Sequence, residues 1–439
     1  RFQTMQGIGN SFYIVNAGAV EEMVLETGGT MAESIAAGFG MNLIPKEGSN
    51  IFTYSASGMF TNKDLQSGNL SDELRARRLA APQEVPELFE VAATCGGPIV
   101  KDRLWLFTSQ RLWGNRNQVP GVFWNKTQGA PIYTPDLERP YIRSQTNNAH
   151  SVRLTWQASD KNKIAMFVDP QRQRLFGSAA EFTAPEAVTS NWNFWPVALF
   201  QVSWNSPRTS RLLLEAGVSA TINHWPGIRA PGVLPEHISI LEQSTNFTYG
   251  AAGGAGPYGD EPCRKTDRYA ERFSVSYITG SHNYKFGVQH EYGIHDEVAT
   301  HSGAPLTYRF NNGIPNQLTQ YTTPYILKTR LKADMGIFAQ DRWTINRLTL
   351  NYGLRFDYLN VAGLETDLPA TQFSGPRKFD AIAKVPEWKD VSPRAGFSFD
   401  LFGDGSTAVK ATIGKYVIGH NDAIALAVHP ITTTVNSTA

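Results

Sequence analysis

The stretch GIFAQDRWTINRLTLNYGLRFDY, from Gly336 to Tyr358, carries the clearest structural pattern of the chain. Its second half has an apolar side chain at every second position, namely Leu348, Leu350, Tyr352, Leu354, Phe356 and Tyr358. Because side chains of a β-strand alternate between two faces, this period of two predicts a strand with one apolar and one polar face. A turn at residues 345–347 joins it to a preceding strand, so the stretch predicts a β-hairpin.

Similar patterns recur along the chain, with connections of two kinds between them. The alternation returns at Val152, Leu154 and Trp156, at Phe273, Val275 and Tyr277, at Tyr284, Phe286 and Val288, and at Ala395, Phe397, Phe399 and Leu401. Tight turns are predicted at residues 100–102, 159–162, 206–209, 280–283, 345–347 and 403–406. Long polar connections join consecutive hairpins at residues 114–148, 226–266, 300–325 and 361–389. Short and long connections therefore alternate.

This alternation predicts an all-β fold, a transmembrane antiparallel β-barrel. In outer-membrane barrels short turns face the periplasm and long loops face the outside, whereas a soluble sandwich or propeller has no such asymmetry. The strands of residues 336–358 also have about the 9–11 residues that a tilted strand needs to cross a bilayer. Aromatic residues near strand ends are expected to form interfacial girdles, for instance Trp105, Phe107 and Trp113, or Trp192, Phe194 and Trp195.

Composition argues against several other classes of protein. Lys+Arg 40 against Asp+Glu 39 gives a net charge of +1 without a long basic block, so a nucleic-acid partner is not expected. No run of about 18 apolar residues predicts a transmembrane helix. The first ten residues lack the apolar core of a signal peptide, which suggests a trimmed or fragmentary chain. Cys95 and Cys263 are either a pair formed in an oxidising compartment or two unpaired thiols.

No motif predicts an enzyme, a metal site or a cofactor. His290 and His295 are spaced one residue wider than the ligands of the zinc-protease motif, and on a strand they point to opposite faces. The glycine-rich residues 251–256 lack the Lys-Ser/Thr pair and the helix of a phosphate-binding loop, so they predict a mobile loop. One short helix is expected at residues 71–79, where Ser71 can cap the first turn.

Several segments, in order along the chain, resemble TonB-dependent outer-membrane receptors of the Oar-like group. Residues 20–29, 32–33 and 40–50 resemble the end of the plug domain, which leads to a first barrel strand at residues 51–61. The stretches 96–107, 336–358 and 392–405 resemble barrel hairpins of that group. The resemblance implies that residues 1–50 form the C-terminal part of a plug domain and residues 51–439 the N-terminal part of a barrel. About 13 of about 22 strands are expected, as in part of a longer gene product.

By this resemblance, the intact protein is expected in the bacterial outer membrane, in contact with its lipid. It would take up a bulky extracellular solute, such as a siderophore, an oligosaccharide or a peptide. The TonB–ExbB–ExbD complex would supply the energy through the plug, with no covalent chemistry in the barrel. Two alternatives stay open, namely an outer-membrane surface-binding or adhesion protein without transport, and a secreted soluble all-β enzyme or lectin.

The candidate site residues are charged side chains on the polar phase of predicted strands. We expect five of them to face the barrel interior and to contact the plug or a ligand: Arg153, Lys285, Arg355, Asp357 and Arg394. Salt bridging between the plug and the wall is the simpler of these roles. Ala36 and Gly38 are expected inside the barrel radius near such residues. The competing view is that residues 20–27 and 41–45 are two further wall strands.

Overall fold

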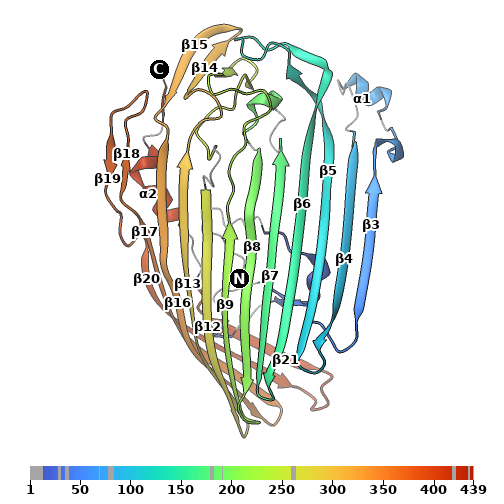
Figure 1. Cartoon of the computed structure of the whole chain (residues 1–439). Helices are drawn as coiled ribbons and strands as arrows, with labels where there is room; N and C mark the ends of the chain where they lie inside the picture. The colour runs from blue at the N-terminus through green and yellow to red at the C-terminus, as the bar shows by residue number, and fades with distance from the viewer. Residues whose placement is uncertain are drawn as a thin grey trace.

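One large antiparallel sheet dominates the computed structural model, which describes residues 13–27, 31–34, 39–68, 70–77, 84–177, 182–189, 191–258, 264–417, 422–433 and 436–438. Its 13 strands follow one another in chain order, each paired with the next (Figure 1). The strands are β3 (Thr53–Thr61), β4 (Glu87–Val100), β5 (Leu104–Asn125), β6 (Pro135–Ser159), β7 (Asn162–Phe176), β8 (Trp192–Pro207), β9 (Leu212–Asn223), β12 (Arg264–Thr279), β13 (His282–Ala299), β16 (Tyr325–Ile345), β17 (Leu348–Gly363), β20 (Glu387–Asp400) and β21 (Ala408–Gly414). Among the described residues β3 and β21 each pair with one strand of this sheet, so the prediction of an incomplete barrel of about 13 strands is confirmed.

All six predicted tight turns are confirmed, and they lie at the lower end of the sheet in Figure 1. The turn between β16 and β17 contains Asn346 at φ 50°, a left-handed conformation that asparagine adopts more readily than most residues. The longer connections lie at the opposite end, where β14 (Leu306–Asn311) and β15 (Ile314–Tyr321) extend above the sheet. The predicted separation of short turns from long loops is therefore present.

The long connections have more regular structure than the sequence predicted. Residues 114–148 are not one polar connection, because β5 continues to Asn125 and β6 begins at Pro135. Residues 114–118 and 143–148 are mostly polar and the apolar residues at 119–124 do not alternate, so no apolar period of two marks these strands. A five-stranded sheet in the order β11-β10-β14-β15-β22 also forms. The smaller elements are β10 (Ser239–Glu242), β11 (Phe247–Tyr249), β18 (Thr366–Leu368), β19 (Arg377–Phe379), β22 (Asn436–Thr438), η2 (Lys63–Leu65), η4 (Pro185–Ala187), η5 (Pro430–Thr433) and α2 (Ala423–Val428).

The short helix predicted at residues 71–79 is present as α1 (Asp72–Ala76). Its N-cap is Ser71, whose Oγ accepts a hydrogen bond from the backbone N–H of Leu74 at 3.3 Å. In the part of the chain that the structure describes, no helix is long and apolar enough to cross a membrane.

The two faces of the sheet differ as the period of two predicted. On β17, Leu354 is 52% exposed and Phe356 37%, whereas Arg355 between them is fully buried. Directly paired residues share a face, and Phe356 lies opposite Ile337 of β16. The outer face is consequently a continuous exposed apolar band, and the inner face holds the buried polar side chains.

The predicted aromatic girdles are wrong for most of the residues named. Phe107 is buried, and a Cβ at Gly96 would lie 2.8 Å from its ring. Because Trp105, Phe107 and Trp113 have the same parity as the buried Ser109, they belong to the inner phase of β5. Phe194 is fully buried on the inner face, and its ring and that of Trp192 contact Trp225. Exposed aromatic residues of the outer face include Tyr277, Tyr292, Tyr352 and Trp156.

The described strands of the N-terminal part of the chain are not members of the 13-stranded sheet. This part contains η1 (Ala17–Ala19) and a hairpin of β1 (Val20–Thr27) and β2 (Phe39–Pro45), which pair only with each other. The view that these segments are two wall strands is therefore wrong. Ala36, Gly38 and Cys263 lie outside the described residues, and Cys95 is an exposed free thiol.

Candidate functional site

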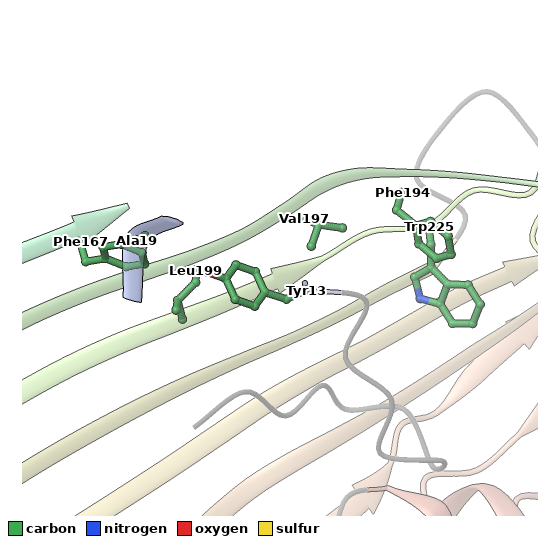
Figure 2. Packing of buried hydrophobic residues seen from close by; sticks show 7 residues of the cluster. All are labelled: Tyr13, Ala19, Phe167, Phe194, Val197, Leu199 and Trp225. Atoms are coloured by element: carbon green, nitrogen blue, oxygen red, sulfur yellow. The ribbon is translucent and has the colours of Figure 1, made fainter. Parts of the chain in front are cut away.

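The candidate site is the surface along which residues 13–27, 31–34 and 39–47 contact the inner face of the sheet, here called the inner contact surface. Its first part is an apolar cluster, in which Tyr13 and Ala19 meet inward side chains of β7, β8 and the segment after β9 (Figure 2). Tyr13 lies beside Leu199 in this view. The buried members are Tyr13, Ala19, Phe167, Phe194, Val197, Leu199 and Trp225. Burial of these groups favours docking of the N-terminal segment on this wall.

Buried polar contacts fix the position of this segment. The hydroxyl of Tyr13 donates to Asp169 Oδ2 at 2.5 Å, and the Gln171 side chain exchanges hydrogen bonds with both backbone groups of Ile14. Asn16 Nδ2 donates to Ser109 O and Ser151 Oγ at 3.2 and 3.0 Å. Burial and the Asp169 charge raise the pKa of Tyr13, so its hydroxyl stays protonated. The contacts specify one placement, because a shifted segment would leave buried polar groups without partners.

Two arginines of the sheet hold the backbone of residues 31–34. Arg355, fully buried on β17, directs Nη1 at the carbonyl oxygens of Ala32 and Glu33, at 3.3 and 3.4 Å. Arg394 of β20 directs Nη1 at Met31 O and Ser34 O, at 2.5 and 2.7 Å. A guanidinium has five N–H donors in a rigid planar group. One arginine can therefore donate to the carbonyl oxygens of two residues in a turn. We call this set of contacts the arginine clamp.

Side chains of two further strands complete the arginine clamp around Glu33. Lys285 of β13 pairs with the Glu33 carboxylate at 2.5 Å, and Gln289 donates to Glu33 O at 3.0 Å. The Glu33 backbone N–H donates to Gln340 Oε1 of β16 at 3.1 Å. Asp357 accepts from Arg355 Nε at 2.6 Å and so balances its buried charge. Strands β13, β16, β17 and β20 therefore hold one short segment through side-chain contacts.

A third set of contacts lies at the residues that lead into β3. Glu47 pairs with Arg153 of β6 at 2.7 Å and with Lys163 of β7 at 2.8 Å. Partial burial on its own raises the pKa of Glu47, but the Lys163 hydrogen bond and the Arg153 charge outweigh it. The pKa therefore lies below its ordinary value.

All five charged residues predicted from the polar phase lie on the inner face, and each belongs to the inner contact surface. Arg153, Lys285, Arg355 and Arg394 contact residues 31–47 directly, and Asp357 acts through Arg355. A cavity of about 420 Å³ lies between the N-terminal segment and the wall, with Asn42, Asp169 and Gln201 among its lining residues. The sequence analysis did not identify Tyr13, Asn16, Asp169, Gln171 or Glu47 as site residues. Asp169 and Gln171 could have been identified, because they are polar residues at inward positions of β7.

Known proteins share this architecture. The sequence profile of the outer membrane beta barrel domain matches residues 125–439, which is more than half of the chain. The chain belongs to the outer membrane beta-barrel family. It is 22% identical, over 90% of its own length, to the TonB-dependent transporter Oar of Myxococcus xanthus, and it covers 44% of that protein.

Solved structures show the same fold for this outer membrane beta-barrel chain. The outer membrane transporter YddB from Escherichia coli matches 97% of the chain at a TM-score of 0.62 and 12% identity. The ferric yersiniabactin uptake receptor FyuA from Yersinia pestis matches 87% at a TM-score of 0.52 and 10% identity. The chain covers 51% and 50% of those two proteins, so it spans about half the length of these relatives. They and Oar are transporters or receptors, in agreement with the prediction that the chain is not an enzyme.

Family membership places the chain in the bacterial outer membrane and makes the sidedness of its loops testable. Ala251 and Ala252 of the predicted mobile loop are buried, so that loop is not a suitable cleavage site. The exposed turn at residues 311–314 joins β14 and β15 at the end of the long loops, whereas the turns at residues 160–161 and 401–407 lie at the periplasmic end. Protease added to intact cells is expected to cut the turn between β14 and β15 and to spare both periplasmic turns. Mass spectrometry of the fragments locates the cuts. Cleavage at either periplasmic turn in cells that retain a periplasmic marker protein would reverse the topology.

The lowered pKa of Glu47 implies that the stability of the segment leading into β3 depends on pH. Since its pKa is lowered in the folded protein, its contacts stabilise the fold above the unfolded pKa and are lost as the pH falls through the folded value. We expect the exchange rate of backbone amides of residues 46–50 with solvent deuterium, divided by the intrinsic rate at the same pH, to increase as the pH falls through the folded pKa of Glu47. In Glu47→Gln this acid-dependent increase is expected to disappear. A Glu47→Gln profile that retains the wild-type rise would assign it to another group.

Proposed function

We propose that the intact protein is an outer-membrane receptor that imports a bulky solute, with energy transduced through TonB. Residues 1–50 would be the C-terminal part of its plug and residues 51–439 the N-terminal part of its barrel. The observation that carries the proposal is the inner contact surface. A segment that lies within a curved sheet, without a hydrogen-bonded strand pair to it, can be displaced without breaking the wall.

The kind of contact supports a displaceable plug. Residues 31–34 are held by side chains of four strands, and Glu47 by two more, whereas the wall strands are held by continuous backbone ladders. Hydrogen bonds of individual side chains break one at a time under a load that leaves the ladders intact. The names of two relatives support the same proposal, because Oar is a TonB-dependent transporter and FyuA is an uptake receptor.

The solute would be a siderophore, an oligosaccharide or a peptide that the extracellular loops capture. The partners would be the TonB–ExbB–ExbD complex on the periplasmic side, the lipid around the apolar band and the solute outside. No cofactor is part of this proposal. In this proposal the solute passes through the interior of the barrel, and the plug blocks that passage until it is displaced.

Uptake by energised cells tests the proposal against a purely adhesive role. Cells that express the intact gene are compared with a deletion strain, using labelled ferric siderophores, oligosaccharides and peptides as probes. We expect gene-dependent accumulation of one class, and its loss when a protonophore collapses the inner-membrane proton gradient or when TonB is deleted. Gene-dependent binding at the surface without accumulation would support the adhesion protein and overturn transport.

A further inference from the structure

The outer face of β7 changes from apolar to basic along its length. Outward positions carry Ile164, Met166, Val168 and Pro170, and the next two outward positions carry Arg172 and Arg174. The neighbouring strand is apolar at the same level, because Val168 lies opposite Phe200 and Pro170 opposite Ala198. The chain runs from the periplasmic turn toward the long loops here (Figure 1). The two arginines therefore lie directly above the apolar band, on its extracellular side.

Among the residues that the structure describes, no carboxylate forms an ion pair with either of these guanidinium groups. Arg172 Nε donates to the neutral side chain of Asn193 at 3.1 Å, and the charge that acts on it is that of Arg174, which repels it. Arg174 is exposed, and neither arginine has a described carboxylate within the 4.0 Å of an ion pair. Two like charges on one face, two residues apart, are unfavourable unless an anion lies nearby.

Three arginines of the inner face, by contrast, are paired with carboxylates. Arg111 pairs with Glu90, Arg268 with Glu291 and Asp334, and Arg355 with Asp357. The pair on β7 differs from these three arginines in facing outward. Its level on the wall, where the apolar band ends, is that of the lipid headgroups of the outer leaflet.

We infer that Arg172 and Arg174 form a site for the phosphate of an outer-leaflet lipid whose headgroup has a net negative charge. A guanidinium binds phosphate oxygens in a bidentate manner, and two of them on one face suit a phosphate that lies against the wall. The acyl chains of the same lipid would contact the exposed side chains of Val168 and Phe200 below. Asn148 and Asn193 add neutral hydrogen-bonding groups beside Arg172. This site is independent of the solute and of the proposed transport.

Lipid selectivity of the intact protein tests the inference. The wild type and Arg172→Gln/Arg174→Gln are placed in nanodiscs of phosphatidylcholine with a minor share of phosphatidylglycerol, and retained lipids are counted by native mass spectrometry. We expect the wild type to enrich phosphatidylglycerol and the double variant to lose roughly thirtyfold in relative affinity, from about fivefold for each basic residue at a membrane surface. The matched control is Arg139→Gln, on the β6 segment that extends beyond the apolar band.

A charge-conserving variant and a competition with inorganic phosphate complete the test. The charge-conserving Arg172→Lys/Arg174→Lys variant is expected to keep most of the enrichment, which separates loss of charge from failure to fold. An excess of inorganic phosphate is expected to leave the lipid bound, because the acyl chains also hold it. Equal enrichment in the wild type and the glutamine variant would overturn the site. Displacement by inorganic phosphate would overturn the assignment to a lipid.

Discussion

Substitution of Arg355 by alanine is expected to lower the free energy of unfolding by about 3–5 kcal/mol, because it leaves a buried carboxylate without its ion-pair partner. Arg355 is fully buried and its Nε lies 2.6 Å from Asp357 Oδ1. In the described part of the chain, the weak contact of Ser392 Oγ at 3.5 Å and the more distant charge of Arg394 remain near Asp357. The measurement is equilibrium unfolding of the intact gene product in lipid vesicles at increasing urea concentration.

The same substitution is expected to loosen the N-terminal segment. Without Arg355 Nη1, the carbonyl groups of Ala32 and Glu33 lose one of their donors. Hydrogen exchange of the Glu33 amide, which donates to Gln340, should therefore become faster. Gly336→Ala offers an independent route to the same result, because the added Cβ would lie 1.7 Å from Arg355 Nη2 and displace it.

A double variant separates the two roles of Arg355. In Arg355→Met/Asp357→Leu both charges are replaced by apolar groups, so most of the lost stability is expected to return. Fast exchange at Glu33 is expected to persist, since the hydrogen bonds from Arg355 to the carbonyl groups of Ala32 and Glu33 are still absent. Arg309→Ala, on the extracellular strand β14, is the matched control and should change neither measurement. Unchanged stability and exchange in Arg355→Ala would show that the arginine clamp does not hold the segment.

The wall of the barrel could be predicted from sequence because each of its strands follows one repeating rule. Alternation at residues 348–358 requires one face in a nonpolar medium, and a charged residue such as Arg355 on the opposite phase must then face inward. The five candidate residues were found in this way. Their partners were not, because Arg355 and Arg394 bind backbone carbonyl groups, which are present at every residue and leave no mark in the sequence.

The errors have a related physical cause. Phe107 and Phe194 were assigned to the outer face because aromatic residues usually cluster at membrane interfaces. A period of two distinguishes two faces but does not say which is inside when both carry apolar residues. Here the inside is partly apolar because Tyr13 and Ala19 dock against it, and Tyr13 meets Asp169 across 156 residues of sequence. Contacts of that separation depend on the whole fold rather than on a local pattern.

Substitution of Leu354 by arginine tests the outer face as directly as Arg355 tests the inner one. Leu354 is 52% exposed, lies opposite Ala339 of β16, and has the exposed Ile337 and Phe356 as neighbours on the same face. A guanidinium there would have to enter hydrocarbon or draw water and headgroups toward it. The expected loss in folding free energy is about 2–4 kcal/mol if the position lies near the bilayer midplane, and less near an interface.

Folding titrations of the intact protein in lipid vesicles measure this loss, with two variants to isolate its cause. Leu354→Ala removes the side chain without adding a charge, and on a lipid-facing surface it leaves no internal cavity, so its effect should be much smaller than that of arginine. Ile314→Arg places the same charge at an exposed position of the extracellular strand β15, where Ile314 is 67% exposed, and should be nearly neutral. If Leu354→Arg were as mild as Ile314→Arg, the apolar band would face water. The exposed apolar surface of the sheet would then require a protein partner in place of lipid.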